Sequence, residues 1–314
     1  MPSPLVSVSV DLDAVLCYHR IHALAEAPSG DARFAILRRA LPRLGDMFAA
    51  HGIFATFFVV GQDLEEDPEG KAILADLARA GHEIASHTHS HPYDLIRLGR
   101  KGMAAELDRA HAAIAEAFIC PPVGFRAPGY EISAELVELL VERGYRYDSS
   151  TFPAIPYYLA KAAVMTAIRM MGRKSGSILG SPKVLGAPTV PYRPAVGAPY
   201  RRGELPIIEL PITVTPLVRL HVIGTTLVLA PEWLRRRMVA SALGTPLFNL
   251  ELHGIDLADA ASDGLSSALV ARQPDLRVPL ARKRAALDAT IAQARAAGAT
   301  FVTLAEAAEH FAKA

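Results

Sequence analysis

Three histidines alternate in the segment His-Thr-His-Ser-His at residues 87–91. The apolar residues before them, 83–86, are typical of a β-strand, which would place the imidazoles at the rim of a sheet, where metals are commonly held. A lone histidine usually binds no metal, so a surface cluster or a backbone-bonded core histidine is the alternative. Asp11 and Asp13 follow a second strand-like segment at 5–10. Two carboxylates and several imidazoles at strand ends indicate a hydrolytic metal site.

The metal ligands are expected to be Asp13, His87 and His91. A divalent metal that activates water needs a few firm protein ligands and open positions for water and substrate. The two histidines are four residues apart, which suits the first turn after a strand, because side chains at that spacing share a face. His89 would point elsewhere, so we expect it outside the ligand set.

Asp11 is expected to stay unligated and to take a proton from the attacking water as general base. It lies two residues before Asp13, and two carboxylates this close disfavour each other's ionisation unless a cation intervenes. Arg126 would be that cation, fixing Asp11 through bidentate hydrogen bonds. The alternative for an arginine in a proline-containing turn is a solvated loop residue.

Groups for the leaving amine and the carbonyl oxygen are also present. Gly129 would bring a backbone N–H close to the substrate as an oxyanion donor, and Tyr130 follows it in the same substrate-facing turn. His253 ends a late strand-like segment and is the candidate general acid for a leaving amine. The alternative for His253 is a rim histidine without a role.

The elements that would position these residues alternate between strand and helix. Strands are expected at 5–11, 55–61, 82–87, 124–128, 145–149, 207–210, 247–253 and 300–304, and helices at 34–51, 70–80, 102–118, 133–143, 231–243, 282–297 and 305–312. This repeat predicts parallel strands with helical crossovers, and about seven or eight such units favour a barrel over an open sheet. Sites in such barrels lie at the carboxyl ends of strands, where all the candidate residues fall, with Asp148 among them.

Composition sets the limits of the interpretation. The chain has 314 residues, 51% of them hydrophobic, so one large α/β domain over 1–314 is expected. Prolines and glycines interrupt the pattern at about 153–204, which we interpret as an insertion or lid. A net charge of +1 and the absence of a nucleic-acid motif argue against nucleic-acid partners.

The expected location is cytoplasmic. Two distant cysteines give no disulfide framework, and the first residues do not resemble a signal peptide. No apolar run reaches the ~20 residues needed to span a bilayer. The apolar stretch 157–171 has basic residues at its edges, so it would either lie on the anionic inner face of a membrane or form an ordinary packed amphipathic helix.

The motifs occur in an order that resembles the polysaccharide deacetylase family, also known as the NodB-homology or carbohydrate esterase 4 family. They are Asp11-x-Asp13, His87-Thr88-x-x-His91, Arg126-x-Pro128, Asp148-x-x-x-Phe152 and Leu250-x-x-His253. The resemblance implies a distorted (β/α) barrel with a mid-chain insertion, and metal-dependent hydrolysis of an acyl group on a sugar. It makes Asp11 the base and His253 the acid, with Arg126 orienting Asp11 and Asp148 orienting His253. The resemblance also implies zinc on Asp13, His87 and His91, with cobalt, nickel, manganese or iron as alternatives.

Three departures from the family pattern bear on the substrate. The usual adjacent Asp-Asp is Asp-Leu-Asp here, the aromatic of the fourth motif is Phe152 instead of Trp, and Arg-Ala-Pro-Gly-Tyr replaces Arg-x-Pro-Tyr-Gly. We therefore expect removal of an acetyl or formyl group from an amino sugar, with free, lipid-linked and nucleotide-linked sugars as the variants. The alternatives are a metal-independent, allantoinase-like amide hydrolase and a non-catalytic relative that binds glycan or lipid. The sequence gives no cue to the oligomeric state.

Overall fold

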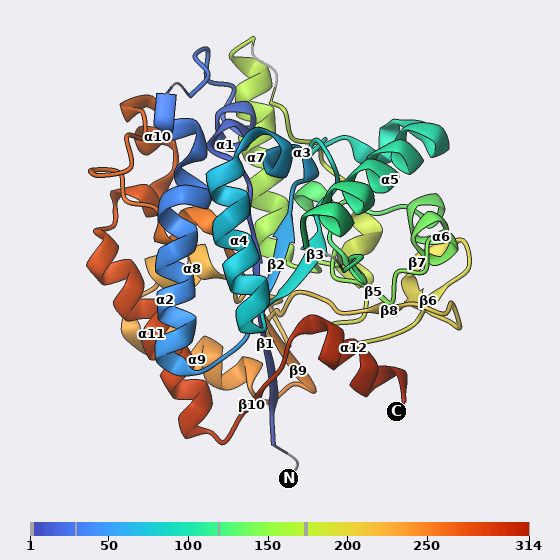
Figure 1. Cartoon of the computed structure of the whole chain (residues 1–314). Coiled ribbons are helices and arrows are strands. Elements are labelled where there is room, and N and C mark those ends of the chain that lie inside the picture. The colour runs from blue at the N-terminus through green and yellow to red at the C-terminus, as the bar shows by residue number, and fades with distance from the viewer. Residues whose placement is uncertain (1–2, 29, 119, 173–174, 314) are drawn as a thin grey trace.

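The computed structural model describes residues 3–28, 30–118, 120–172 and 175–313. Its centre is a curled sheet of parallel strands, surrounded by helices on the outside (Figure 1). The sheet runs in the order β10-β1-β2-β3-β4-β5-β8, and β9 pairs with the free side of β1. The α/β architecture of a distorted barrel is thus confirmed.

The bounds of the elements follow the expected alternation. The strands are β1 (Leu5–Asp11), β2 (Thr56–Val59), β3 (Glu83–Ser86), β4 (Gly124–Phe125), β5 (Tyr147–Asp148), β6 (Pro194–Ala195), β7 (Ala198–Arg202), β8 (Ile208–Glu209), β9 (Leu247–His253) and β10 (Thr300–Phe301). The helices are α1 (Val15–Ile21), α2 (Leu41–His51), α3 (Gly61–Glu66), α4 (Pro68–Ala80), α5 (Gly99–Phe118), α6 (Ala134–Glu142), α7 (Ile155–Met170), α8 (Gly224–Leu229), α9 (Glu232–Ala242), α10 (Ser267–Arg272), α11 (Leu280–Ala296) and α12 (Leu304–Ala312). No helix among the described residues is long and apolar enough to cross a membrane.

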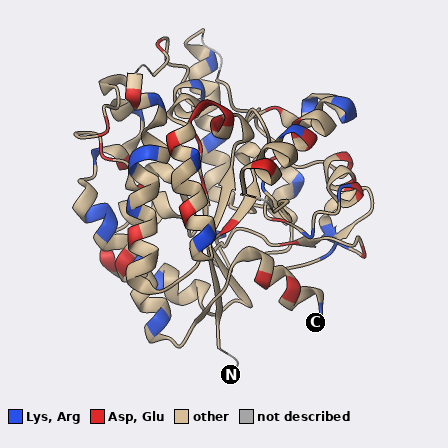
Figure 2. Ribbon diagram, viewed as in Figure 1, with Lys and Arg blue, Asp and Glu red and all other residues tan. Residues whose placement is uncertain are grey.

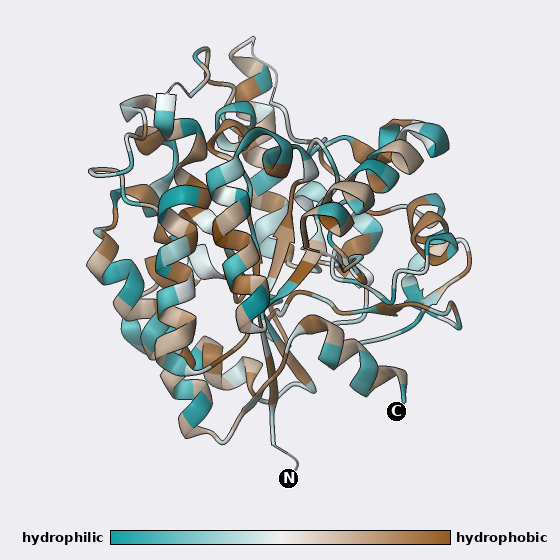
Figure 3. Ribbon diagram, viewed as in Figure 1, coloured by the Kyte–Doolittle hydropathy of each residue, from teal (hydrophilic) through white to brown (hydrophobic). Residues whose placement is uncertain are grey.

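Strand β1 is the central element, and both of its faces are buried. Its valines Val6, Val8 and Val10 pack into the main hydrophobic core, which includes side chains of α2 and α11. The alternate residues, Ser9 and Asp11 among them, are equally buried but polar, because they face the interior of the curled sheet. In Figure 3 the outer helices α2 and α4 alternate between hydrophilic and hydrophobic turns, as expected for helices that cover a sheet with one face.

Contacts of Asn249 on β9, in place of a continuous strand ladder, connect β9 to the segment that follows β8. The Asn249 amide of β9 donates to the Leu210 carbonyl at 3.1 Å and to Ser149 Oγ at 2.9 Å. The Asn249 backbone N–H donates to Thr213 Oγ1 at 2.9 Å. The segment that follows β8 is therefore held beside β9 without a continuous ladder, and the barrel is distorted at this place.

The predicted mid-chain insertion is occupied by helix α7, a 3-10 turn at Pro182–Gly186 and the antiparallel hairpin β6–β7. Its chain leaves the sheet after β5 and returns at β8, which pairs with β5. In Figure 1, α7 rises from the sheet toward the top of the view.

Two carboxyl groups are buried together where β5 pairs with β8. Asp148 and Glu209 are inaccessible to solvent and are paired across the two strands. Burial raises the pKa of Asp148 to about 6, and burial together with the neighbouring Asp148 raises the pKa of Glu209 well above its usual range. Asp148 also accepts a hydrogen bond from Ser150, whose Oγ accepts the Ala127 N–H at 2.8 Å. The pair thus supports the turn that follows Arg126.

The loop after β9 is held by a buried lysine from α11. Lys283 donates to the carbonyls of Ile255 at 3.1 Å and Ala258 at 3.0 Å, and its Nζ lies 3.8 Å from Asp275. These carbonyls belong to the turn that directly follows His253. An ammonium group without solvent contact is stable only when paired and hydrogen-bonded, which this arrangement provides.

Replacing Lys283 with methionine keeps most of the side-chain volume and removes the charge. We expect Lys283→Met to lose about 2–4 kcal/mol of the free energy of unfolding, because two carbonyls and Asp275 lose their partner. Urea unfolding measures the change. The control is Arg284→Met, an exposed neighbour for which a change below about 0.5 kcal/mol is expected. Equal losses for the two variants would contradict the structural role of Lys283.

The Asp148–Glu209 pair predicts a stability that falls with rising pH. Both pKa values lie above those of unfolded carboxyls, about 4, so the contribution of the pair is complete below about pH 4. It is lost as the pH rises through about 6, the pKa of Asp148, and beyond. In the Glu209→Gln variant, the glutamine amide can donate a hydrogen bond to Asp148, and the amide itself does not titrate. Between about pH 6 and 9 this variant should lose about 1 kcal/mol less stability than the wild type.

Urea unfolding at the two pH values tests this expectation. The exposed Glu204 supplies the matched control, since Glu204→Gln removes the same charge elsewhere and should follow the wild type. The hypothesis of a shared proton fails if Glu209→Gln and the wild type lose equal stability.

Candidate metal centre and active site

The predicted ligands Asp13, His87 and His91 meet at the carboxyl-end edge of the sheet. Asp13 Oδ1 lies 3.2 Å from His87 Nε2 and 3.1 Å from His91 Nε2. Each of the three residues offers a ligand atom within 4.8 Å of the others, and all three are buried. Asp13 Oδ1 and His91 Nε2 make no well-directed hydrogen bond. Buried lone pairs that converge in this way fit a divalent cation with one carboxylate and two imidazole ligands.

His87 is oriented by its other ring nitrogen. The Nδ1–H donates to the Arg126 carbonyl at 2.7 Å, which leaves Nε2 free to face Asp13. Metal-binding histidines commonly have such a partner, because it fixes the tautomer and the ring orientation.

A tight loop, and not a helical turn, brings His91 to the cluster. Thr88 and His91 have left-handed φ values of 68° and 54°, and the His91 N–H donates to Thr88 Oγ1 at 3.1 Å. Glu106 of α5 accepts hydrogen bonds from the backbone of His89 and Ser90. The helical-turn rationale for the four-residue spacing is therefore wrong, because this loop reverses the chain instead of continuing it as a helix. The same histidines are nevertheless brought together.

Arg126 is fully buried and joins three strands. Its guanidinium donates to Asp11 Oδ1 at 2.6 Å, to Ser9 Oγ at 3.0 Å and to the carbonyl and Oγ of Ser149. It also lies over the Phe58 ring at 4.1 Å. The expected bidentate contact with Asp11 is wrong, since one nitrogen reaches Asp11 and the other donors reach serines. Asp11 is still held beside the metal cluster, with its Oδ2 4.0 Å from His87 Nε2.

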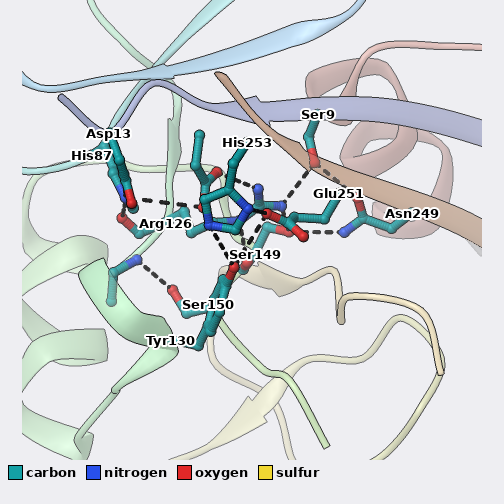
Figure 4. A network of polar contacts seen from close by, with 12 residues as sticks. Ser9, Asp13, His87, Arg126, Tyr130, Ser149, Ser150, Asn249, Glu251 and His253 are labelled. Carbon is teal, nitrogen blue, oxygen red and sulfur yellow. Dashed lines mark hydrogen bonds and ion pairs between the residues drawn. The ribbon is translucent and has the colours of Figure 1, made fainter. Parts of the chain in front are cut away.

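His253 has a carboxylate partner that the sequence reasoning missed. Glu251 Oε1 lies 2.8 Å from His253 Nδ1, and the Tyr130 hydroxyl lies 3.2 Å from both Glu251 Oε1 and His253 Nε2 (Figure 4). Asp256 accepts the His253 backbone N–H at 2.9 Å. Residues two apart on a strand share a face, so the position of Glu251 on β9 was the available signal.

The charges around His253 favour the imidazolium. Burial disfavours the charged ring, but the Glu251 carboxylate, with Asp13 and Asp11, outweighs burial and raises the pKa of His253 well above its usual range. Burial likewise opposes ionisation of Asp13, and the imidazoles of His91 and His87 outweigh it, so that the pKa of Asp13 stays well below its usual range. The surrounding charges thus favour the protonated form of His253 and the ionised form of Asp13.

The remaining predicted residues lie around this centre. Asp148 is bonded to Ser150 and Glu209, so the structure gives His253 a different carboxylate from the one the family resemblance implies. Gly129 has a left-handed φ of 63°, and its carbonyl accepts from Lys161 at 3.3 Å. Its N–H as an oxyanion donor stays a prediction. His89 faces Glu65 at 3.8 Å, outside the ligand cluster.

A cleft of about 310 Å³ opens beside the cluster. Its lining includes His91 of the cluster and polar groups of both charges, which are Arg20, Arg33, Asp63 and Glu66. This volume suits a small ligand such as one sugar residue.

Comparison with known proteins agrees with this geometry. A polysaccharide deacetylase family model matches residues 31–147. A peptidoglycan deacetylase of Helicobacter pylori is 30% identical over 158 residues, which cover 49% of this chain and 53% of that protein. A chitooligosaccharide deacetylase of Sinorhizobium fredii is 35% identical over 85 residues, 27% of this chain and 37% of that protein. The chain therefore spans about half or less of the length of these curated relatives.

Solved structures resemble the whole fold. A putative polysaccharide deacetylase from Mycobacterium smegmatis superposes with a TM-score of 0.62 at 21% identity, covering 99% of this chain and 91% of that one. The Bc1960 peptidoglycan N-acetylglucosamine deacetylase superposes with a TM-score of 0.51 at 14% identity, covering 96% and 87%. The family-model match over residues 31–147, the partial matches to curated deacetylases and the shared fold therefore make this chain similar to polysaccharide deacetylases.

Proposed function

We propose that this protein hydrolyses the N-acyl group of an amino sugar with a divalent metal held by Asp13, His87 and His91. The observation that carries the proposal is the convergence of three buried ligand atoms within 4.8 Å of one another. A base candidate bound to Arg126 and an acid candidate bound to Glu251 stand at the same edge of the sheet. Zinc is the first choice for this donor set, since it binds imidazole and carboxylate ligands together.

Asp11 is the proposed general base. A divalent metal bound at this cluster would polarise the acyl carbonyl and acidify the attacking water. Asp11 accepts the proton of that water, and the bond from Arg126 keeps its carboxylate in place. The N–H of Gly129 is proposed to stabilise the negative charge that develops on the acyl oxygen.

His253 is the proposed general acid. Its Nδ1–H is held by Glu251, so that Nε2 is the nitrogen that delivers a proton to the departing amine. The Tyr130 hydroxyl beside Nε2 keeps the ring in this orientation until substrate binds. A raised pKa keeps His253 protonated at neutral pH, as an acid requires.

The proposed substrates are N-acetyl or N-formyl amino sugars, free, nucleotide-linked or lipid-linked. The names of the relatives support an acylated amino sugar, since they act on peptidoglycan and chitooligosaccharides. Mass spectrometry of such a panel, with zinc supplied, tests the proposal and identifies the acyl group. Hydrolysis that persists after the metal is removed would favour the allantoinase-like alternative. Tight glycan binding without hydrolysis would favour a non-catalytic relative.

Metal content discriminates the three histidines of the segment 87–91. His91→Gln should lose the bound metal and at least ~10²-fold in kcat/KM, because several kcal/mol of charge stabilisation depend on it. His89→Gln is the matched control and should keep about one equivalent of metal, as one site with three protein ligands predicts. Elemental analysis and activity assays measure both effects. Loss of metal from His89→Gln alone would refute the assigned ligand set.

The pH profile discriminates Glu251 from Asp148 as the partner of His253. In Glu251→Gln, His253 loses the carboxylate that favours its charged form, although Asp11 and Asp13 remain and Arg126, Tyr130 and Asp256 stay nearby. The pKa of His253 falls, so the alkaline limb of kcat should move to lower pH by about one unit or more, with kcat reduced ~10²-fold.

Asp148→Asn is the control for this experiment, since it removes the carboxylate that the family resemblance pairs with His253. It should leave the alkaline limb in place, because Asp148 contacts Ser150 and Glu209. A shifted limb in Asp148→Asn, with an unchanged one in Glu251→Gln, would reverse the assignment.

A further inference from the structure

Charge is distributed very unevenly along the chain. Residues 149–203 contain eight of its 33 basic residues and none of its 32 acidic ones. The basic residues are Lys161, Arg169, Arg173, Lys174, Lys183, Arg193, Arg201 and Arg202. The whole protein is almost neutral, so the strong positive balance belongs to this one segment. Such a segment attracts an anionic partner.

Helix α7 lies within this segment and packs on the active site with one face. The Tyr157 ring lies 6.2 Å from Tyr130 and 4.9 Å from Phe152. Lys161 pairs with Glu131 at 3.2 Å and donates to the Gly129 carbonyl. Among the residues of α7, these side chains and the buried Ile168 mark the sheltered face.

The outward face of α7 is mostly apolar. Leu159 is 60% exposed, Val164 51% and Met170 84%. Ala160, Ala163, Thr166 and Ala167 are exposed on the helix as well, and the charged side chain among its exposed residues is Arg169. A helix on a protein surface ordinarily turns polar residues outward. The hydropathy view shows hydrophobic turns in the upper part of α7, and no acidic residue colours this helix (Figures 2 and 3).

A second apolar protrusion stands near the first turn of α7. Leu217 is 95% exposed and Val218 64%, at the tip of a hairpin closed by a bridge between Val214 and His221. The His221 ring lies 6.0 Å from the Tyr157 ring. The hairpin therefore contacts the first turn of α7 at its base, and both elements carry exposed apolar side chains.

We infer that α7 and the tip of this hairpin seat the protein on an anionic lipid bilayer. Apolar side chains on a helix bury into the boundary between headgroups and acyl chains, and basic residues nearby bind anionic headgroups. Basic side chains lie beside both apolar elements: Arg169 is exposed on α7, and Lys183 is exposed in the turn Pro182–Gly186, whose Leu185 carbonyl accepts a hydrogen bond from Arg219 of the hairpin. This inference goes beyond the proposed reaction and does not depend on it.

A second copy of the chain fits this face less well. In a symmetric dimer the same patch of both copies meets itself. Contact through α7 would bring the exposed Arg169 of both copies together on a helix that carries no acidic residue to pair with it, and like charges in an interface are repelled. An anionic bilayer removes that repulsion and covers the same apolar side chains.

Lys161 and Tyr157 connect the proposed bilayer-binding helix α7 to the candidate active site. Both side chains leave α7 on its sheltered face and touch the turn of Gly129, Tyr130 and Glu131. A helix lying on the bilayer would therefore hold that turn close to the lipid headgroups.

Vesicle flotation tests the inference with the full chain. The wild type is mixed with phosphatidylcholine vesicles, with or without phosphatidylglycerol. Binding to the anionic vesicles is expected, and added salt should weaken it. The variant Leu159→Gln/Val164→Gln/Met170→Gln should bind at least ~10-fold more weakly, because three apolar side chains lose their affinity for the acyl region.

The matched control, Phe54→Gln/Leu98→Gln/Trp233→Gln, changes three exposed apolar residues outside the segment and should bind like the wild type. Circular dichroism establishes that both variants are folded. The inference is overturned if the wild type does not bind anionic vesicles, or if both variants bind equally. It is also overturned if light scattering shows a wild-type dimer that the α7 variant converts to a monomer, which would assign the face to a second copy.

Discussion

The buried guanidinium of Arg126 is the interaction on which the rest of the site depends. A charged group without solvent contact needs a carboxylate and hydrogen-bond acceptors around it, and here Asp11, Ser9 and Ser149 supply them. These partners come from the first strand and from the turn after β5. Because the Arg126 carbonyl also orients His87, one residue fixes both the candidate base and a candidate metal ligand. The polar interior of the sheet is therefore a scaffold for the chemistry at its edge.

Two buried carboxylates near the site, Glu251 and Asp148, have different roles because their neighbours differ. Glu251 faces an imidazole and keeps a positive charge next to it. Asp148 faces Glu209, another carboxyl, and the raised pKa of each favours its protonated form. The first arrangement suits a group that donates protons to substrate, and the second suits a support beneath the turn that carries Gly129. The neighbouring group, more than the residue type, determines which of these two roles a carboxylate has.

Much of the fold could be predicted from the sequence, for identifiable reasons. The strands at 5–11 and 247–253 have the predicted bounds, because long alternating or continuous apolar runs specify strand pairing strongly. The loop at 88–91 could not be predicted, since Thr88 and His91 are left-handed and the residues between them are bonded by Glu106 from helix α5. The partner of Asp148 could not be predicted either, because Glu209 lies 61 residues away, beyond the insertion. Glu251 as the partner of His253 could have been predicted, because residues two apart on a strand share a face.

The Asn249 contact that joins the segment after β8 to β9 has a consequence for how this fold can vary. A strand ladder fixes the register of both partners along their length, whereas the contacts of Asn249 with Ser149, Leu210 and Thr213 fix one place of attachment. Chain can therefore be added or removed between residues 150 and 208 while the strands that carry Asp11 and His253 keep their alignment. The entropy of closing a loop grows slowly with its length. The opening in the barrel is thus the place where new surfaces can evolve beside an unchanged catalytic edge.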